Sequence, residues 1–188
     1  MTRRNPDITK ETMRSLVHRA CGHRDKKLAR ISVGAALLIA ALSTSARADD
    51  AQDCHAAGGS LLTGRAVSPP TFKHGMFRHG VELSHTHLRI KGDADGKTYD
   101  IAIDNVFASG YQKNSKGVPA PLNTIKVGDK IEACGIPYSG GIHWVHNNCG
   151  DTPTASDPNG WLKIVQADGS VGPNLEDGQK YCILWPHR

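Results

Sequence analysis

The first part of this 188-residue chain holds one uninterrupted run of apolar and small residues, ISVGAALLIAAL at positions 31–42. Three basic residues lie within the five positions before the run, and Ala46-Arg47-Ala48 follows it. A basic flank, a short apolar core and a small-x-small end together describe a secretory signal peptide. The run is shorter than the roughly 20 residues that a membrane-spanning helix needs. We therefore expect residues 1–48 to be removed on export, leaving residues 49–188 as one periplasmic or extracellular domain.

The start of this leader has two candidate positions. The segment before the apolar run is long for a signal peptide, and Met13 offers a second translation start besides Met1. Arg3-Arg4 lies far from the apolar run and lacks the hydrophobic residues that follow a twin-arginine signal. The pair therefore does not indicate that export route.

The basic character of the whole chain belongs to the leader. Of the 23 Lys and Arg residues, 10 lie in the first 48 positions, against 3 of the 18 Asp and Glu residues. The remaining domain is slightly acidic and has no basic stripe, the charge pattern that nucleic-acid binding proteins usually carry. We expect no nucleic-acid partner and, after cleavage, no membrane span.

Four cysteines remain after the leader, which itself contains Cys21. An even number of cysteines in an exported chain predicts disulfides, here two. Three connectivities are possible. We favour Cys134 with Cys149, which would clamp one local segment, and Cys54 with Cys182, which would tie the ends of the domain together. A zinc site built from cysteines is the weaker interpretation because the chain has no Cys-x-x-Cys pair.

Proline, glycine and other turn-forming residues are spread over the whole domain, which shows no sustained apolar period of 3.6 residues. Long helices are therefore not expected. Short alternating or apolar runs predict strands at residues 60–67, 81–91, 98–107, 126–134, 141–146, 161–165 and 180–185. Asp95-Gly96 and Asp168-Gly169 predict tight turns, because glycine supplies the positive φ that such turns require. Seven short strands predict a mainly β domain, either a small OB-like barrel or a sandwich.

Eight histidines remain after the leader, and most of them lie in pairs along the chain. His85 and His87 are two residues apart, so on a strand both side chains point to one face and could share a metal ion. His143 and His146 are three residues apart and would converge only where the backbone bends, as the preceding glycines allow. These four residues predict a site that would suit zinc or copper. The alternative is that they are surface or strand-pairing histidines.

Acidic and aromatic residues offer further candidates. Asp100 and Asp104 are four residues apart and would lie on one face of a strand, where paired carboxylates can perform acid–base catalysis or hold a hard cation. His143 is a further candidate for catalysis. Solvated residues on an exposed face would explain the aspartates equally well. Trp144 could provide a platform for a ligand, although a core or rim tryptophan has the same pattern.

A spaced pattern runs through Gly128-Asp129, Tyr138, Gly140-Gly141-Ile142-His143-Trp144-Val145-His146 and Gly160-Trp161. This pattern resembles that of a family of small exported bacterial domains of unknown function. The resemblance implies an OB-type barrel and a special role for His143, Trp144 and His146. The cysteines and the earlier histidine pair are additions to the pattern of that family.

Together these observations lead to one principal hypothesis and two alternatives. We expect a small exported β-barrel that binds a small ligand or a metal ion through its histidine-rich face. A metal-dependent hydrolase that uses the same histidines, with Asp100 or Asp104 as base, is the first alternative. A structural or interaction module with incidental histidines is the second.

Overall fold

The structure is a computed structural model that describes residues 49–185, so the predicted leader lies outside the described residues. Residues 49–56 are helical. The strands are β1 (Ser60–Ala66), β2 (Thr71–Lys73), β3 (Phe77–Arg78), β4 (Val81–Glu82), β5 (His85–Gly92), β6 (Thr98–Asp104), β7 (Lys130–Tyr138), β8 (Gly141–His143) and β9 (Trp161–Val165). Three short 3-10 helices are η1 (Asn105–Phe107), η2 (Leu122–Thr124) and η3 (Cys182–Leu184). Among the described residues, no helix is long and apolar enough to span a bilayer.

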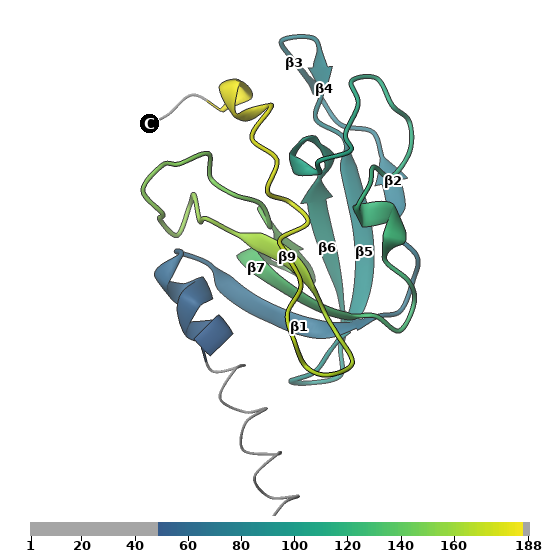
Figure 1. Ribbon diagram of the computed structural model, residues 1–188, viewed down its shortest axis with the longest axis vertical. Helices are drawn as coiled ribbons and strands as arrows, with labels where there is room; N and C mark the ends of the chain where they lie inside the picture. Colours follow the sequence, from purple (N-terminus) through teal and green to yellow (C-terminus); the bar gives the residue numbers. More distant parts are fainter. Residues whose placement is uncertain (1–48, 186–188) are drawn as a thin grey trace, which may run out of the picture.

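Five of the strands close into a barrel. Neighbours follow the order β1-β5-β6-β8-β7, and β7 returns to β1 through an antiparallel ladder from Ser60↔Gly135 to Arg65↔Lys130. Within this ring only β6 and β8 pair in parallel. Outside it, β9 pairs with β7 and β2 pairs with β5 (Figure 1). Ring closure gives each barrel strand a hydrogen-bonded neighbour on both sides.

Alternation along β5 and β6 decides which side chains fill the barrel. Leu88 and Ile90 of β5 and Ile101 and Ile103 of β6 are fully buried, and they belong to the main hydrophobic core. The residues between them point to the outer face and are half-buried or exposed. Because the side-chain period of a strand is two, these apolar positions fix the outward direction of every intervening residue.

A second apolar cluster gathers segments that are distant in sequence. Phe107 and Leu184 belong to it, and Cys149, Cys182 and Trp185 pack against it. The loop that follows β8 and the C-terminal segment therefore meet on one side of the barrel (Figure 1). This cluster supports the cavity described below.

The sequence located the barrel strands, but several of their ends are shifted. The strand predicted at 161–165 coincides with β9. The strand predicted at 126–134 begins only at Lys130, because Gly128 has a φ of +95° and turns the chain. The strand predicted at 81–91 is divided into β4 and β5, and the one predicted at 98–107 ends where η1 begins.

Two predictions near the end of the chain were wrong. The strand predicted at 141–146 ends at His143, because the next residue, Trp144, has a φ of +60° and leaves the strand conformation. Residues 180–185 contain the 3-10 helix η3 in place of a strand. Leu184 is buried in the second cluster, so the apolar character of this segment reflects packing against loops and not strand pairing.

Both predicted turns are present. The β5–β6 hairpin closes around Gly96, whose φ is +69°. Gly169 has a φ of +87°, and the isolated bridge between Val165 and Val171 flanks its turn. In both cases the glycine takes a backbone conformation that other residues adopt only with strain.

The two predicted disulfides form, but the favoured pairing was wrong. Cys54 is bonded to Cys134, and Cys149 is bonded to Cys182. The β1–β7 ladder sets Leu61 opposite Cys134, so the residues just before β1 lie close to Cys134. The β7–β8 hairpin brings the chain back beside Gly135, and after the turn at Trp144 the chain continues to Cys149, which is bonded to the C-terminal segment.

This pairing makes a direct prediction for the stability of the domain. The Cys54–Cys134 bond closes a loop of 80 residues, for which chain entropy predicts about 4 kcal/mol of stabilisation. We expect the C54A/C134A variant to lose about that much free energy of unfolding in urea titrations. Peptide mapping without reduction should recover the pairs 54–134 and 149–182. Recovery of a 134–149 peptide would contradict the fold.

Candidate functional site

The outer face of β5 and β6 carries four of the predicted site residues. His85 and His87 lie on the same face, with ring centroids 6.5 Å apart. Across the ladder, His85 is opposite Asp104, and Asp100 is opposite Arg89. The spacing of two residues in β5 and of four in β6 therefore places both members of each pair on one face of the sheet, as expected for a strand.

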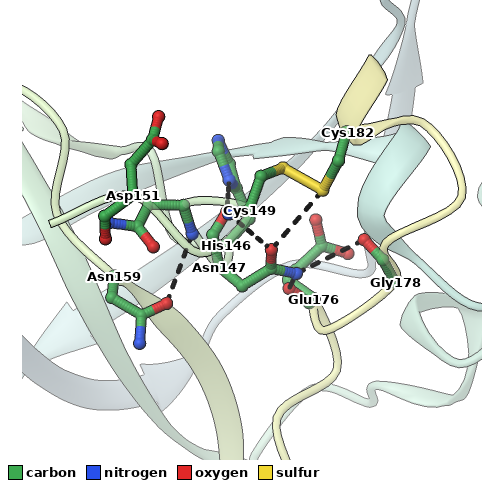
Figure 2. The surroundings of a disulfide bond; sticks show 9 residues. His146, Asn147, Cys149, Asp151, Asn159, Glu176, Gly178 and Cys182 are labelled. Carbon is green, nitrogen blue, oxygen red and sulfur yellow. Dashed lines mark hydrogen bonds between the residues drawn. A yellow bond between two sulfur atoms is a disulfide. The ribbon is translucent and has the colours of Figure 1, made fainter. Parts of the chain in front are cut away.

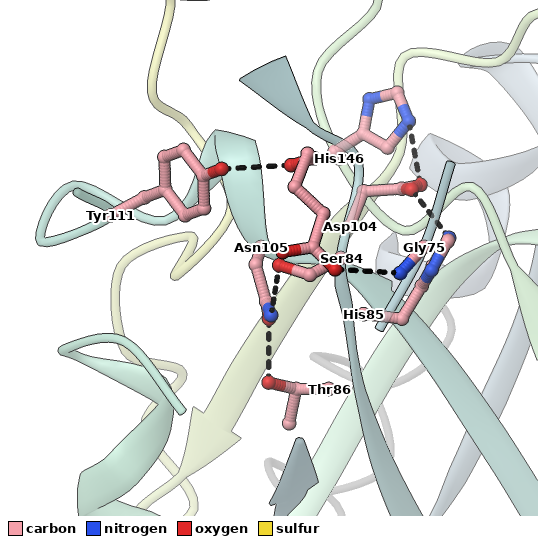
Figure 3. A network of polar contacts seen from close by, with 9 residues as sticks. Gly75, Ser84, His85, Thr86, Asp104, Asn105, Tyr111 and His146 are labelled. Atoms are coloured by element: carbon pink, nitrogen blue, oxygen red, sulfur yellow. Dashed lines mark hydrogen bonds and ion pairs between the residues drawn. The ribbon is translucent and has the colours of Figure 1, made fainter. Parts of the chain in front are cut away.

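Asp104 forms the centre of one polar cluster, shown in Figure 3. Its carboxylate lies 2.9 Å from Nε2 of His85 and 3.4 Å from Nε2 of His146. Burial alone would raise the pKa of Asp104, but the contacts of its carboxylate with the His146 and His85 rings outweigh it and hold that pKa well below its usual range. The hydrogen bond to Asp104 also raises the pKa of His85. The cluster therefore keeps a negative charge between two imidazoles.

Asp100 forms a second cluster on the same face. Its Oδ2 lies 2.7 Å from Nδ1 of His87 and accepts a 2.7 Å hydrogen bond from the Tyr138 hydroxyl. Burial, together with this hydrogen bond, raises the pKa of Tyr138. His143 stands edge-on to the Tyr138 ring, with centroids 5.8 Å apart. Tyr138 can cross to Asp100 because Gly141 is beneath it, where a Cβ would lie 2.6 Å from the hydroxyl.

The four histidines of the predicted metal site thus occupy different surroundings. His85 and His146 share Asp104, His87 binds Asp100, and His143 contacts Tyr138. Across residues 49–185, no three side chains of His, Cys, Asp and Glu are arranged to hold a metal ion. A zinc or copper site, and a catalytic role for Asp100, Asp104 or His143, stay predictions.

A cavity of about 160 Å³ lies beside His146, over the second apolar cluster. Three aromatic side chains line it, those of Phe107, Trp144 and Trp185. The His146 ring is stacked on Phe107, with centroids 3.8 Å apart and an angle of 5° between the planes. Charged residues on its wall are Arg78, Asp151 and Asp157. The cavity therefore combines apolar ring surfaces with charges of both signs.

Trp144 is the most unusual residue of the cavity wall. Its φ of +60° is a conformation that bulky residues rarely adopt, and its buried indole Nε1 has no hydrogen-bond partner among the described residues. Gly160 packs so closely against this turn that a Cβ would lie 2.5 Å from the Trp144 carbonyl oxygen. Strained backbone and unpaired buried groups concentrate at functional sites.

The walls of the cavity are fastened to one another, as Figure 2 shows. The Cys149–Cys182 disulfide joins the loop after β8 to the C-terminal segment. Asn147 strengthens this connection, because its Oδ1 accepts from the backbone N–H of Cys149 and its Nδ2 donates to the carbonyl oxygen of Gly178. Arg78 donates a 2.8 Å hydrogen bond to the carbonyl oxygen of Leu184. These contacts hold the cavity in shape without a ligand.

Glu176 is fully buried near the Asp104 cluster. Neither of its carboxyl oxygens has a hydrogen-bond partner among the described residues. Burial, and then the charge of Asp104, raise its pKa well above the usual range. Burial therefore favours the neutral, protonated form of Glu176.

The sequence indicated only part of this cavity. His146 and Trp144 were singled out, whereas Arg78, Phe107 and Trp185 come from separate segments without a recognisable motif. The Asn147-Asn148 pair was a usable signal, since asparagine side chains in loops often bind neighbouring backbone groups. No known protein-family model matches the chain, and a search of curated proteins finds no significant match. The resemblance to the exported bacterial family stays a prediction.

The Asp104 cluster predicts how His85 titrates. Replacing Asp104 with Asn removes the negative charge that raises the pKa of His85, so this pKa should fall toward its ordinary value. Histidine NMR signals followed through a pH titration measure the change. Asp100→Asn is the matched control and should leave His85 unaffected, because Asp100 binds His87. An unchanged His85 titration in Asp104→Asn would contradict the assigned contacts.

Glu176 predicts a pH-dependent loss of stability. The unfolded chain ionises this residue above about pH 4.3, whereas burial in the folded protein raises its pKa, so the free energy of unfolding falls as pH rises from there. Glu176→Gln removes the ionisation and should gain stability relative to the unaltered protein, increasingly between about pH 4.5 and 7. Denaturant titrations test this. The exposed neighbour Asp177→Asn should show no such trend, and parallel pH profiles for Glu176→Gln and the unaltered protein would refute the assignment.

Proposed function

We propose that this protein is an exported β-barrel domain that binds a small organic ligand in the cavity beside His146 and Trp144. The observation that carries the proposal is the cavity itself, which three aromatic rings and three charged side chains line. Ligand sites combine apolar and aromatic walls with a few placed polar groups in this way.

The size of the cavity limits the ligand. A buried cavity of about 150 Å³ accepts a molecule the size of benzene. The volume of about 160 Å³ here therefore suits a ligand of roughly six to nine non-hydrogen atoms. Such a ligand would contact ring faces on more than one side, which gives favourable burial for a compact molecule.

The same proposal includes the barrel type and the compartment. The order β1-β5-β6-β8-β7, with one parallel pair, supports an OB-type barrel as the scaffold. Two disulfides support an oxidising compartment, and the signal-like segment at residues 1–48 supports export. In OB-type barrels the loops around the barrel mouth contribute to ligand binding, and the cavity is built from such loops.

The three tryptophans supply an internal test of the proposed site. Titration with phenol, indole and imidazole should shift the indole N–H signals of Trp144 and Trp185 in saturable fashion for at least one probe. The signal of Trp161, which does not line the cavity, should stay in place. Saturable shifts confined to Trp161, or absent from all three, would count against the cavity.

Removing one disulfide at a time gives the matched control. C149A/C182A separates the two walls of the cavity and should weaken binding of the best probe at least about tenfold. C54A/C134A removes a disulfide that does not line the cavity and should keep the affinity, measured where circular dichroism shows both variants folded. Equal affinities in the two variants would show that the walls do not form the site.

A further inference from the structure

The cavity beside His146 is lined by one positive and one negative side chain that form no ion pair with another residue in the range 49–185. Arg78 and Asp157 both line it. The ion pairs of the described residues include neither of them. Opposite charges that line one small cavity without pairing to each other are available to a ligand.

The positive group is held in position by contacts that leave most of its donors free. One Nη of Arg78 donates to the carbonyl oxygen of Leu184, and the guanidinium lies 5.7 Å from the centre of the Trp185 ring. A guanidinium has five N–H donors in a planar fork that matches a carboxylate. Arg78 can therefore bind a carboxylate without giving up its contact with Leu184.

The negative group is held by a tight loop. Asp157 and Thr154 exchange two backbone hydrogen bonds of 3.1 Å each, which close the turn between them. These bonds use the backbone of Asp157, and its carboxylate has no hydrogen bond to another described residue. Asp151 adds a second carboxylate on the same wall.

We propose that the ligand of this cavity is a small zwitterion of the α-amino acid type, with its carboxylate on Arg78 and its ammonium on Asp157. Its side chain packs against the Trp144 and Trp185 rings. The inference rests on the proposed function, because it names the ligand class of the same cavity.

The charges of the wall discriminate against simpler ligands. A cation without a carboxylate leaves Arg78 unpaired and meets its like charge. An anion without an ammonium leaves Asp157 unpaired and meets its like charge. Only a ligand with both charges pairs both groups, and an aliphatic amino acid up to the size of leucine has the roughly six to nine non-hydrogen atoms that the volume allows.

The test is isothermal titration calorimetry on the purified domain with three compounds that share an isobutyl group: leucine, 3-methylbutylamine, which lacks the carboxylate, and 4-methylpentanoate, which lacks the ammonium. Alanine and valine extend the series to smaller side chains. We expect at least one of the three amino acids to bind. The amine and the acid should each bind at least about tenfold more weakly than the best-bound amino acid.

Two variants, each of which removes one charged group from the cavity wall, test the proposed contacts with the ligand. Arg78→Leu and Asp157→Asn should each weaken amino-acid binding at least about tenfold. The matched controls Arg89→Leu and Asp53→Asn change exposed residues away from the cavity and should leave the affinity unchanged. Thermal unfolding curves check that all four variants are folded.

The outcomes separate this inference from the proposed function. If the amine or the acid binds at least as tightly as the best-bound amino acid, or if Arg78→Leu and Asp157→Asn bind that amino acid like the unaltered protein, the zwitterion assignment is overturned. If no amino acid binds but an uncharged probe such as phenol shifts the Trp144 and Trp185 signals, the zwitterion assignment fails and the cavity stands as a ligand site. If neither type of compound binds, both proposals fail.

Discussion

The pairing of β1 with β7 is the constraint on which the rest of the structure depends. It closes the barrel through a ladder from Ser60↔Gly135 to Arg65↔Lys130 and joins segments more than 60 residues apart in sequence. This ladder places Leu61 opposite Cys134, which brings the segment before β1 beside Cys134, where Cys54 is bonded, and Cys149 is bonded to Cys182. The register also fixes which side chains of the strands point outward, because a shift by one residue would move the core-facing side chains to the solvent face.

A second constraint acts at the end of β8, where Trp144 turns the chain out of the barrel. A positive φ at a tryptophan is unfavourable, so the surrounding contacts must hold it. Gly160 provides the space for the Trp144 carbonyl, and the Cys149–Cys182 disulfide fastens the loop that follows. The barrel thus supplies rigidity, while the loops that leave it shape the cavity.

The sequence predicted what depends on local alternation and turn chemistry. β9, the β5–β6 hairpin and the shared face of His85 and His87 all follow from a period of two and from Asp-Gly turns. It did not predict what depends on distant pairing. The disulfide connectivity was wrong because the β1–β7 contact has no local signature, and the strand at 180–185 was wrong because apolar residues there pack on loops.

In the candidate site, too, the sequence predicted local features but not the contacts between distant segments. His146 and Trp144 stand out in a short motif, but the motif does not reveal that Arg78, Phe107 and Trp185 complete the cavity. These residues come from β3, η1 and the C-terminal end, and they meet only through the second apolar cluster and its disulfide. Candidate residues could therefore be named from sequence, whereas the chemistry of their surroundings required the fold.

The arrangement around Asp104 also determines what His146 contributes to the cavity. Its Nδ1 lies 2.6 Å from the carbonyl oxygen of Asn147, and its Nε2 faces Asp104 at 3.4 Å. With both nitrogens directed at protein oxygens and one ring face covered by Phe107, His146 offers the cavity mainly ring surface. The carboxylate of Asp104 contacts the imidazoles of both His146 and His85. The charged groups of the cavity wall are therefore Arg78, Asp151 and Asp157, whereas the histidine that stands out in the sequence contributes its ring face.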